Sequence, residues 1–355
     1  MDALSDVLRV VQLSGAVFLN GEFSAPWCVI GKAESDLCAA YLPPSDRVVS
    51  YHLITAGSCW ASLAGDEHSA IQVDAGEILI VPQGETHLLG SDLALAPIPS
   101  APLLAERLQA HPGEVLRIAY GGGGVQTRMV CGFLTCDEVL SDPLLTALPR
   151  LFKVDMGCDR EASWLASALG FAVMEAAEPR AGSTSVLAKL SELLFVEAVR
   201  CWIETLPEHE EGFLAALRDR YVGRALSRLH MHPAHPWTVD ELAGHVGLSR
   251  SALSQRFTDL LGQAPIQYLA RWRLRLAARE LRSGRKSLAE VAGAVGYDSE
   301  AAFSRAFKRE FGLPPASWRS SQDAPAAMAR HGMLERAIGQ LAGDSLTPAA
   351  GDCTT

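Results

Sequence analysis

The feature that most restricts the fold of this 355-residue chain is an internal repeat near its carboxyl end. Residues 238–249, TVDELAGHVGLS, match residues 287–298, SLAEVAGAVGYD, and after one inserted residue the match continues through 253–265 and 303–315. Self-similarity at a fixed spacing indicates two copies of one small structural unit. The same supersecondary element is therefore expected twice in this part of the chain.

Each copy is predicted to be a pair of helices joined by a tight turn. The first residue of each copy, Thr238 or Ser287, is followed three residues later by a glutamate, the pattern of a capping box at a helix start. Nine residues after that start, both copies have a glycine, which suits the left-handed residue that follows a helix. These signals predict two helix-turn-helix motifs, at residues 238–261 and 287–311.

The segment between the two motifs, residues 267–282, is predicted to be one connecting helix. It contains no glycine or proline and carries apolar residues at near-helical spacing. Such a helix would hold the two motifs at a fixed separation, and successive major grooves on one face of DNA lie about 34 Å apart. Its outward side chains are expected to be Arg271, Arg273, Arg275, Arg279 and Arg282.

The charge of the chain is divided unevenly along its length. The formal net charge is −10, which by itself argues against a nucleic-acid partner. However, residues 224–321 hold 15 Lys and Arg against 8 Asp and Glu, whereas residues 1–223 hold 14 against 29. Because proteins bind nucleic acid largely by neutralising phosphates, a basic segment on an acidic chain indicates that this segment binds nucleic acid.

The first 141 residues have a β pattern, and the next segment has a helical one. Short apolar runs separated by Gly, Pro and Asp predict strands of a small barrel or sandwich, at residues 48–54, 69–73, 77–81 and 128–134. A long insertion covers 94–124. Residues 142–210 are predicted to be helical, notably at 161–178 and 185–206, and these helices either cover the β domain or pair with a second chain.

The location of the protein follows from what the sequence lacks. No apolar run approaches the roughly 20 residues that cross a bilayer, and the acidic start, MDALSD, is unlike a secretory signal. We therefore expect a cytoplasmic protein that does not contact membranes. The eight cysteines form no Cys-x-x-Cys pair, so most are expected to be reduced thiols in a cytosolic chain.

At this point two resemblances are clear. Residues 236–251, 296–303 and 307–315 resemble the DNA-binding domain of the AraC/XylS family over about 98 residues. Residues 51–57 and 75–87 resemble the cupin-type sensor domain of one branch of that family. The resemblance implies a transcription regulator whose amino-terminal domain senses a signal and often dimerises.

The implied fold class is α+β, with a cupin-like β-barrel, a helical middle segment and an all-α double helix-turn-helix. The expected domains are a sensor at 1–141, a helical dimerisation or packing segment at 142–210, a DNA-binding domain at 217–321 and a weakly ordered tail at 322–355.

Carried over by position, the family's pattern assigns the residues that contact DNA. The first motif presents Arg250, Ser251, Ser254 and Gln255, and the second presents Glu300, Ala301, Ser304 and Arg305. Arginine can bind guanine through two hydrogen bonds, glutamine can bind adenine, and glutamate can accept from cytosine. Further contacts are expected mainly at phosphates, from Ser249, Arg250, Arg256, Arg273, Ser299, Lys308 and Arg309.

The cupin resemblance raises the question of a metal site. Gly76, Pro82, Gly84 and His87 fit the second cupin motif, but no histidine or glutamate of the first motif precedes Gly57. Only His52 could approach His87, and two histidines without a carboxylate make a poor iron or zinc site. We expect these two histidines to line an effector pocket, where they could bind a ligand or a weakly held metal or simply satisfy hydrogen bonds of the core. No metal site and no cofactor is predicted.

Two other groups of residues suggest a metal site or a redox site, but their sequence context argues against each. The tract His230-Met-His232-Pro-Ala-His235 is interrupted by extended backbone at its prolines, so a metal site there is disfavoured. Cys131 and Cys136 are the cysteine pair closest in sequence and are redox candidates, although on a strand they would point to opposite faces.

The leading hypothesis is a sequence-specific transcription regulator, not an enzyme, that acts as a homodimer on promoter DNA. Its expected partners are double-stranded operator DNA, a small-molecule or oxidant effector, and RNA polymerase if it is an activator. The alternative is a metal-dependent cupin enzyme with an appended DNA-binding module.

Overall fold

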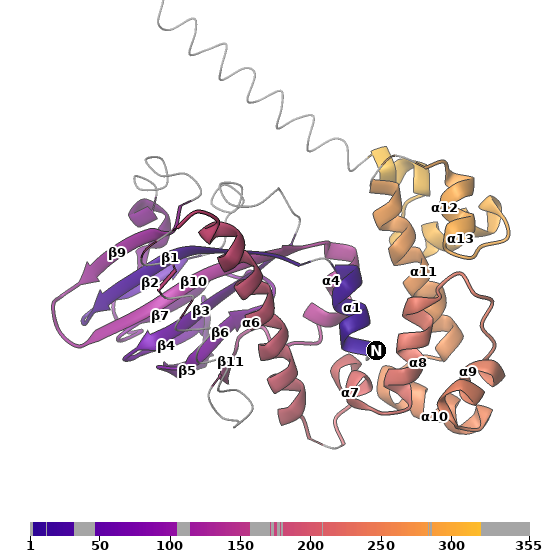
Figure 1. Cartoon of the computed structure of the whole chain (residues 1–355), viewed down its shortest axis with the longest axis horizontal. Helices are drawn as coiled ribbons and strands as arrows, with labels where there is room; N and C mark the ends of the chain where they lie inside the picture. Colours follow the sequence, from indigo (N-terminus) through magenta and orange to yellow (C-terminus); the bar gives the residue numbers. More distant parts are fainter. Residues whose placement is uncertain are drawn as a thin grey trace, which may run out of the picture. The chain divides into compact units, whose positions relative to one another are not determined.

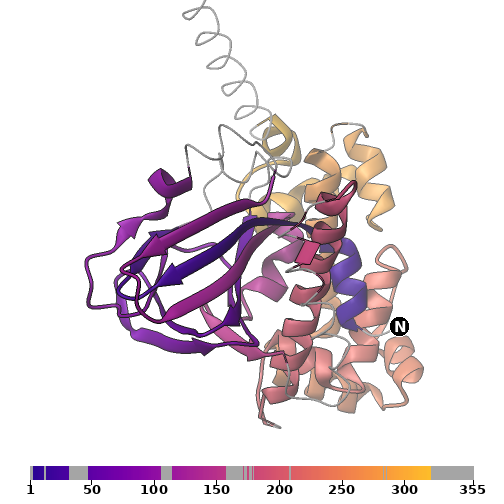
Figure 2. The same ribbon diagram turned by 60° about the vertical axis from the view of Figure 1, so that its left-hand side comes forward.

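The computed structural model gives the protein as two compact units (Figures 1 and 2). The first comprises residues 1–231 and 237–266, and the second comprises 232–236 and 267–355. Within these units the structure describes residues 3–11, 13–31, 47–104, 114–156, 171, 174–175, 178, 180–207, 209–282, 284 and 286–320.

The first unit contains two β-sheets. The six-stranded sheet has the order β11-β6-β3-β10-β1-β9, and the five-stranded sheet has the order β5-β4-β7-β2-β8. The strands of the larger sheet are β1 (Ser14–Ser24), β3 (Arg47–Ala56), β6 (Glu77–Val81), β9 (Leu116–Gly121), β10 (Gln126–Cys136) and β11 (Phe152–Asp155). Those of the smaller sheet are β2 (Cys28–Gly31), β4 (Ser58–Leu63), β5 (Asp66–Asp74), β7 (His87–Gly90) and β8 (Ile98–Pro99).

A sheet-rich amino-terminal part followed by a helical carboxyl-terminal part agrees with the predicted fold class. The predicted closure into a barrel does not appear among the described strands, because they form two separate sheets. The alternation of apolar and polar residues that predicts strands is the same in a barrel and in a sandwich, so it could not decide between them. The four predicted strands correspond to β3, β5, β6 and β10.

Strand β3 is the element that positions the pocket described below. It pairs with β6 on one side and with β10 on the other, so both of its edges are occupied. Successive side chains of a strand point to opposite faces. His52 therefore points toward the interior between the sheets, whereas Tyr51 points toward helix α6 (Ser183–Thr205), the helix predicted at 185–206.

Helix α6 packs very closely on the larger sheet. The Tyr51 hydroxyl forms a buried hydrogen bond of 2.6 Å with the Ser191 hydroxyl. A Cβ atom added at Gly15 in β1 would lie 2.6 Å from the Cβ atom of Ser191, and one added at Gly132 would lie 2.2 Å from the Tyr51 hydroxyl oxygen. Two glycines thus provide the space for this polar contact between sheet and helix.

Four described helices follow α6 in the first unit, and the last two of them form the first helix-turn-helix motif. They are α7 (Phe213–Arg218), α8 (Val222–Met231), α9 (Val239–Val246) and α10 (Arg250–Leu261). Helix α1 (Ala3–Val11) packs on α8, where the buried carboxylate of Asp6 accepts a hydrogen bond from Ser227. Helix α4 (Glu138–Leu145) follows β10 and begins at an Asp137 cap.

The second unit contains the second motif, formed by α12 (Leu288–Ala294) and α13 (Glu300–Phe311). Helix α11 (Pro265–Arg282) confirms the single helix predicted between the motifs, and its first two residues belong to the first unit. The core of the second unit is aromatic: Phe303 and Phe307 are fully buried, and the rings of Phe311 and Trp318 pack against Phe307.

Some predictions fall outside the described residues. Most of the helix predicted at 161–178 and the whole tail at 322–355 belong to this group, as does part of the insertion at 94–124. None of the helices that the structure describes is long and apolar enough to cross a membrane.

Candidate functional site

In the first helix-turn-helix motif each helix begins at a side-chain cap, although only the threonine half of the predicted capping box is seen at Thr238. The Thr238 hydroxyl accepts a hydrogen bond from the Glu241 amide at the start of α9, and Gly247 ends that helix in the left-handed conformation, with φ 79°. Ser249 then caps α10 by accepting from the Ala252 amide at 3.2 Å. The two helices are thereby fixed on either side of a short turn.

The second motif repeats the arrangement. At the start of α12 the capping box of Ser287 and Glu290 is complete, with the hydroxyl and the carboxylate each accepting from the other's backbone amide. Gly296 lies in the turn with φ 89°, and Ser299 caps α13 by accepting from the Ala302 amide. Two helices, α10 and α13, are thus presented in equivalent ways.

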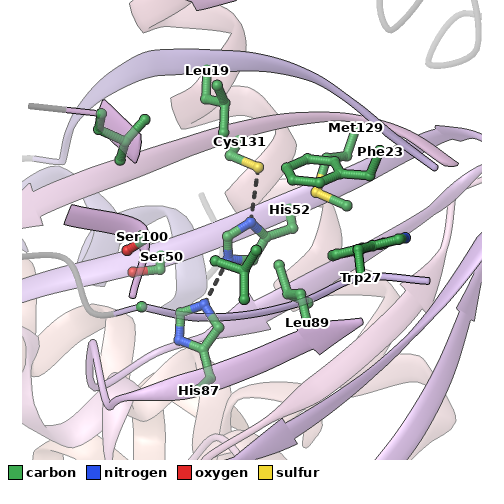
Figure 3. A pocket seen from close by; sticks show the side chains of 13 residues that line it. Leu19, Phe23, Trp27, Ser50, His52, His87, Leu89, Ser100, Met129 and Cys131 are labelled. Atoms are coloured by element: carbon green, nitrogen blue, oxygen red, sulfur yellow. Dashed lines mark hydrogen bonds between the residues drawn. The ribbon is translucent and has the colours of Figure 1, made fainter. Parts of the chain in front are cut away.

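The pocket of the first unit lies between the two sheets (Figure 3). It encloses about 80 Å³, and its walls are mainly apolar. The rings of Phe23 and Trp27 stack at one side, with centroids 4.5 Å apart. The described lining residues are Leu19, Phe23, Trp27, Val29, Gly31, Ser50, His52, His87, Leu89, Ser100, Leu104, Met129 and Cys131.

A chain of hydrogen bonds crosses this pocket. Which atom donates in each of these bonds follows from the bond at the His87 end. His87 Nδ1 lies 2.8 Å from the Glu85 carbonyl oxygen, which can only accept, so Nδ1 carries the proton. In a neutral ring Nε2 must then accept, and it does so from His52 Nε2 at 2.8 Å. His52 Nδ1 in turn accepts from the thiol of Cys131 at 2.9 Å.

The surroundings keep all three side chains of this chain uncharged. Burial lowers the pKa of His52 well below its usual range, and neighbouring His87 lowers it further. Burial also lowers the pKa of His87, although the backbone hydrogen bond to Glu85 acts in the opposite sense. The thiol of Cys131 is 1% exposed, and burial raises its pKa. A neutral, fully directed chain is therefore the resting arrangement.

Comparisons with known proteins match both parts of the chain. A family model described as Cupin matches residues 2–204, and one described as Helix-turn-helix domain matches 242–321. An AraC-like transcription regulator of Streptomyces antibioticus is 32% identical over 90% of this chain and 98% of its own length. The chain belongs to the AraC-like transcription regulators.

Two further proteins are similar to the regulator. AlkR, an HTH-type transcriptional regulator of Acinetobacter baylyi, is 28% identical over 90% of this chain and 99% of its own. The crystallised DNA-binding domain of AdpA, in complex with a target DNA, is 33% identical, with a TM-score of 0.29 over 30% of this chain and 96% of that domain. The relatives' names describe regulators, as predicted, and not enzymes.

The regulator exposes the side chains expected to read bases. On α10 Arg250, Ser251 and Gln255 are exposed and Ser254 is half-buried. Arg250 lies 3.3 Å from Asp240, and the Gln255 side chain donates to Asp259 at 2.6 Å. Both polar contacts are on the surface, where competition with water makes them weak.

On α13 the corresponding side chains have the same exposure. Glu300, Ala301 and Arg305 are exposed and Ser304 is half-buried, and Lys308 and Arg309 are exposed one turn later. Among the residues that the structure describes, Arg305, Lys308 and Arg309 form no ion pair shorter than 4 Å. Ser299, like Ser249 in the first motif, caps its helix with its hydroxyl.

Arg256 and Arg273, both expected to contact phosphates, have partners within the protein. Arg256 donates two hydrogen bonds to Asp219, at 2.7 and 2.5 Å. Arg273, expected to point outward from α11, instead donates to the carbonyl oxygens of Pro233, Gly296 and His235 at 2.6 to 3.1 Å. These bonds occupy donors that a phosphate would need, and the phosphate roles stay predictions.

The redox pair Cys131 and Cys136 is not brought together. Cys131 faces the pocket and His52, whereas Cys136 is five residues along the same strand and is bonded to Ser141. Burial raises the pKa of the Cys136 thiol to about 11. The structure instead joins Cys131 with the two histidines, which the sequence analysis had treated as separate candidates.

Sequence reasoning missed Asp219 and its neighbour Arg218. One carboxylate oxygen of Asp219 accepts from the amides of Tyr221 and Val222 at the start of α8, both at 2.9 Å, while the other holds Arg256. Although burial alone would raise it, the bond from Arg256 lowers the pKa of Asp219. An aspartate before a helix is a capping signal, but the helix itself was not predicted.

Arg218 contacts the chain at the end of helix α6. Its guanidinium donates to the carbonyl oxygens of Leu206 and Pro207 at 2.5 Å each, just past the end of α6. Two adjacent residues therefore link the last helix of the cupin region with the helix that carries the first set of predicted base-reading side chains.

Proposed function

We propose that this regulator recognises operator DNA by inserting α10 and α13 into two adjacent segments of the major groove. The observation that carries the proposal is the pair of equivalently capped helices with exposed polar faces, each containing an arginine suited to guanine. AraC-type regulators bind double-stranded DNA. The domain boundaries given above, 1–141, 142–210, 217–321 and 322–355, belong to this proposal.

Selection of binding sites from random DNA by the full-length chain tests it. We expect a recovered motif with two parts, and loss of base preference in only one part when Arg250 or Arg305 is replaced by alanine. A recovered motif without sequence preference, or a preference unchanged in both variants, would reject the assignment of the reading helices.

We further propose that the cupin pocket senses the signal that controls this DNA binding. The pocket is mainly apolar with a few polar groups, which is typical of small-molecule sites. To test this role, the operator affinity of the wild type and of a pocket variant is measured while extracts that contain the effector are titrated in. An oxidant signal through Cys131 is a separate hypothesis: promoter output of Cys131→Ser under oxidant, equal to that of the wild type, would remove it.

The family role also suggests where and with what the protein works. A homodimer in the cytoplasm, acting on a promoter together with RNA polymerase if it activates, fits a regulator of this organisation. The enzyme alternative gains no support from the pocket, since His52 and His87 bond to each other. Moreover, no group of three His, Cys, Asp or Glu side chains in the described part of the chain is arranged so that it could hold a metal ion.

A further inference from the structure

The described walls of the cupin pocket are uncharged. Of its described lining residues, none is Asp, Glu, Lys or Arg. Burying a charged ligand group without an opposite charge or several hydrogen bonds is strongly unfavourable. A carboxylate or ammonium group would therefore have no ionic partner among these walls.

The two imidazoles cannot easily supply such a partner. Both ring nitrogens of His52 are engaged, one by Cys131 and one by His87, and His87 uses its second nitrogen on the Glu85 carbonyl. Protonating either ring would reverse or break a bond in the directed chain and place a charge in a buried site. The histidines thus form a neutral wall of the pocket, which offers no positive charge to an anionic ligand.

The other walls define two different ends. Phe23, Trp27, Leu89 and Met129 offer apolar and aromatic surface, and Figure 3 shows Ser50 and Ser100 on the opposite side of His52 from Trp27. A Cβ atom at Gly31 would lie 2.6 Å from the Ser100 hydroxyl, so the absence of a side chain at Gly31 leaves room around that hydroxyl. Hydroxyls donate and accept with equal ease and suit a neutral polar group.

The pocket also limits the size of its ligand. Its volume is about 80 Å³, whereas an engineered apolar protein cavity of about 150 Å³ accepts benzene. Short aliphatic molecules fit this space better than large ring systems do.

From these observations we propose that the pocket binds a short, uncharged molecule with an apolar body and one hydrogen-bonding group, such as an aliphatic alcohol. This inference rests on the proposed sensor role of the cupin domain. It specifies the chemistry that selects the ligand: apolar contact at the aromatic end, a hydroxyl partner at the serine end, and exclusion of charge along the histidine wall.

The test is calorimetric titration of the full-length chain at pH 7.5 with three probes of the same shape: butan-1-ol, butyrate and butylammonium. We expect butan-1-ol to bind and the two ions to bind at least about 100-fold more weakly, because their charges would be buried unpaired. Ser100→Leu fills the polar end and should abolish butan-1-ol binding. Ser185→Leu, at an exposed position on α6, is the matched control.

Each outcome has a defined meaning. Binding of either ion as tightly as the alcohol overturns the proposed ligand class, as does the absence of alcohol binding in wild-type protein that still binds operator DNA. Alcohol binding that persists in Ser100→Leu overturns the proposed location. If the alcohol binds as expected but operator affinity is unchanged at saturation, the ligand class stands and the sensor role fails.

Discussion

Asp219 holds Arg256 of helix α10 with one carboxylate oxygen and caps helix α8 with the other. The aspartate therefore positions a helix assigned to DNA reading while carrying the same charge sign as DNA. Removing a negative charge should strengthen non-specific DNA binding, whereas removing a positioning contact should weaken specific binding, so the two effects can be separated.

Asp219→Ala is expected to lower the free energy of unfolding by about 1–3 kcal/mol, since it removes a helix cap and a hydrogen bond between charged groups. Cognate DNA affinity should fall despite the more positive net charge. Denaturant melting and gel-shift titration measure both effects. Glu211→Ala removes the same charge from an exposed neighbouring position, and affinities that match in the two variants would contradict a positioning role.

Arg305 and Lys308 should respond differently to substitution. Arg305→Ala is expected to weaken operator binding by about 1–3 kcal/mol and to relax base preference at one position, because a lost base contact affects one sequence only. Lys308→Ala should weaken binding to all sequences and reduce the salt slope by about 1. Binding to cognate and random DNA across a salt series checks this, and equal losses for Arg305→Ala on both would contradict base reading.

Two glycines should give opposite stability changes. Gly15→Ala places a Cβ atom 2.6 Å from the Ser191 Cβ and 2.8 Å from the Ala188 carbonyl oxygen, so a destabilisation of about 1–3 kcal/mol is expected from overpacking. Gly244→Ala, inside α9 with open space around it, should stabilise by about 1 kcal/mol through helix propensity. Urea unfolding compares them, and a neutral Gly15→Ala would show that α6 can shift away.

His230 should contribute to acid sensitivity. It is 5% exposed, and burial lowers its pKa from 6.5 to about 3. Below pH 6.5 the unfolded chain binds a proton that the folded chain does not, so stability falls by about 1.4 kcal/mol per pH unit until about pH 3. Above pH 6.5 this contribution is constant.

His230→Leu should therefore flatten the dependence of stability on pH between about 6.5 and 5. Chemical unfolding at several pH values provides the comparison. If the slope is the same for wild type and His230→Leu, the imidazole is protonated in the folded protein.

The helix-turn-helix motifs could be predicted almost residue by residue because their signals are local. Thr238, Ser287, Gly247 and Gly296 act through hydrogen bonds and backbone angles within a few residues, and each appears where its sequence context suggests. The strand containing His52 was likewise evident from its short apolar run, whereas the strand that begins at His87 was not predicted.

Long-range partnerships could not be predicted in the same way. Cys131 meets His52 only because β10 and β3 pair in a particular register, and the sequence carries no local record of that register. Arg256 and Arg273 look like phosphate ligands in sequence because basic residues on helices are usually solvated. Their engagement by Asp219 and by three carbonyl oxygens depends on segments at least 23 residues away.

Arg218 and Asp219 are consecutive, so a single peptide bond separates the contact to the end of α6 from the contact to α10. An in-frame insertion of one codon between them would add about 3.3–3.6 Å of extended chain, more than the length of either hydrogen bond. Such a protein should keep both domains folded. However, the contact of Arg218 with the end of α6 would no longer be rigidly connected to the contact of Asp219 with α10. The insertion would therefore distinguish signalling from folding in a way that substitution of either side chain cannot.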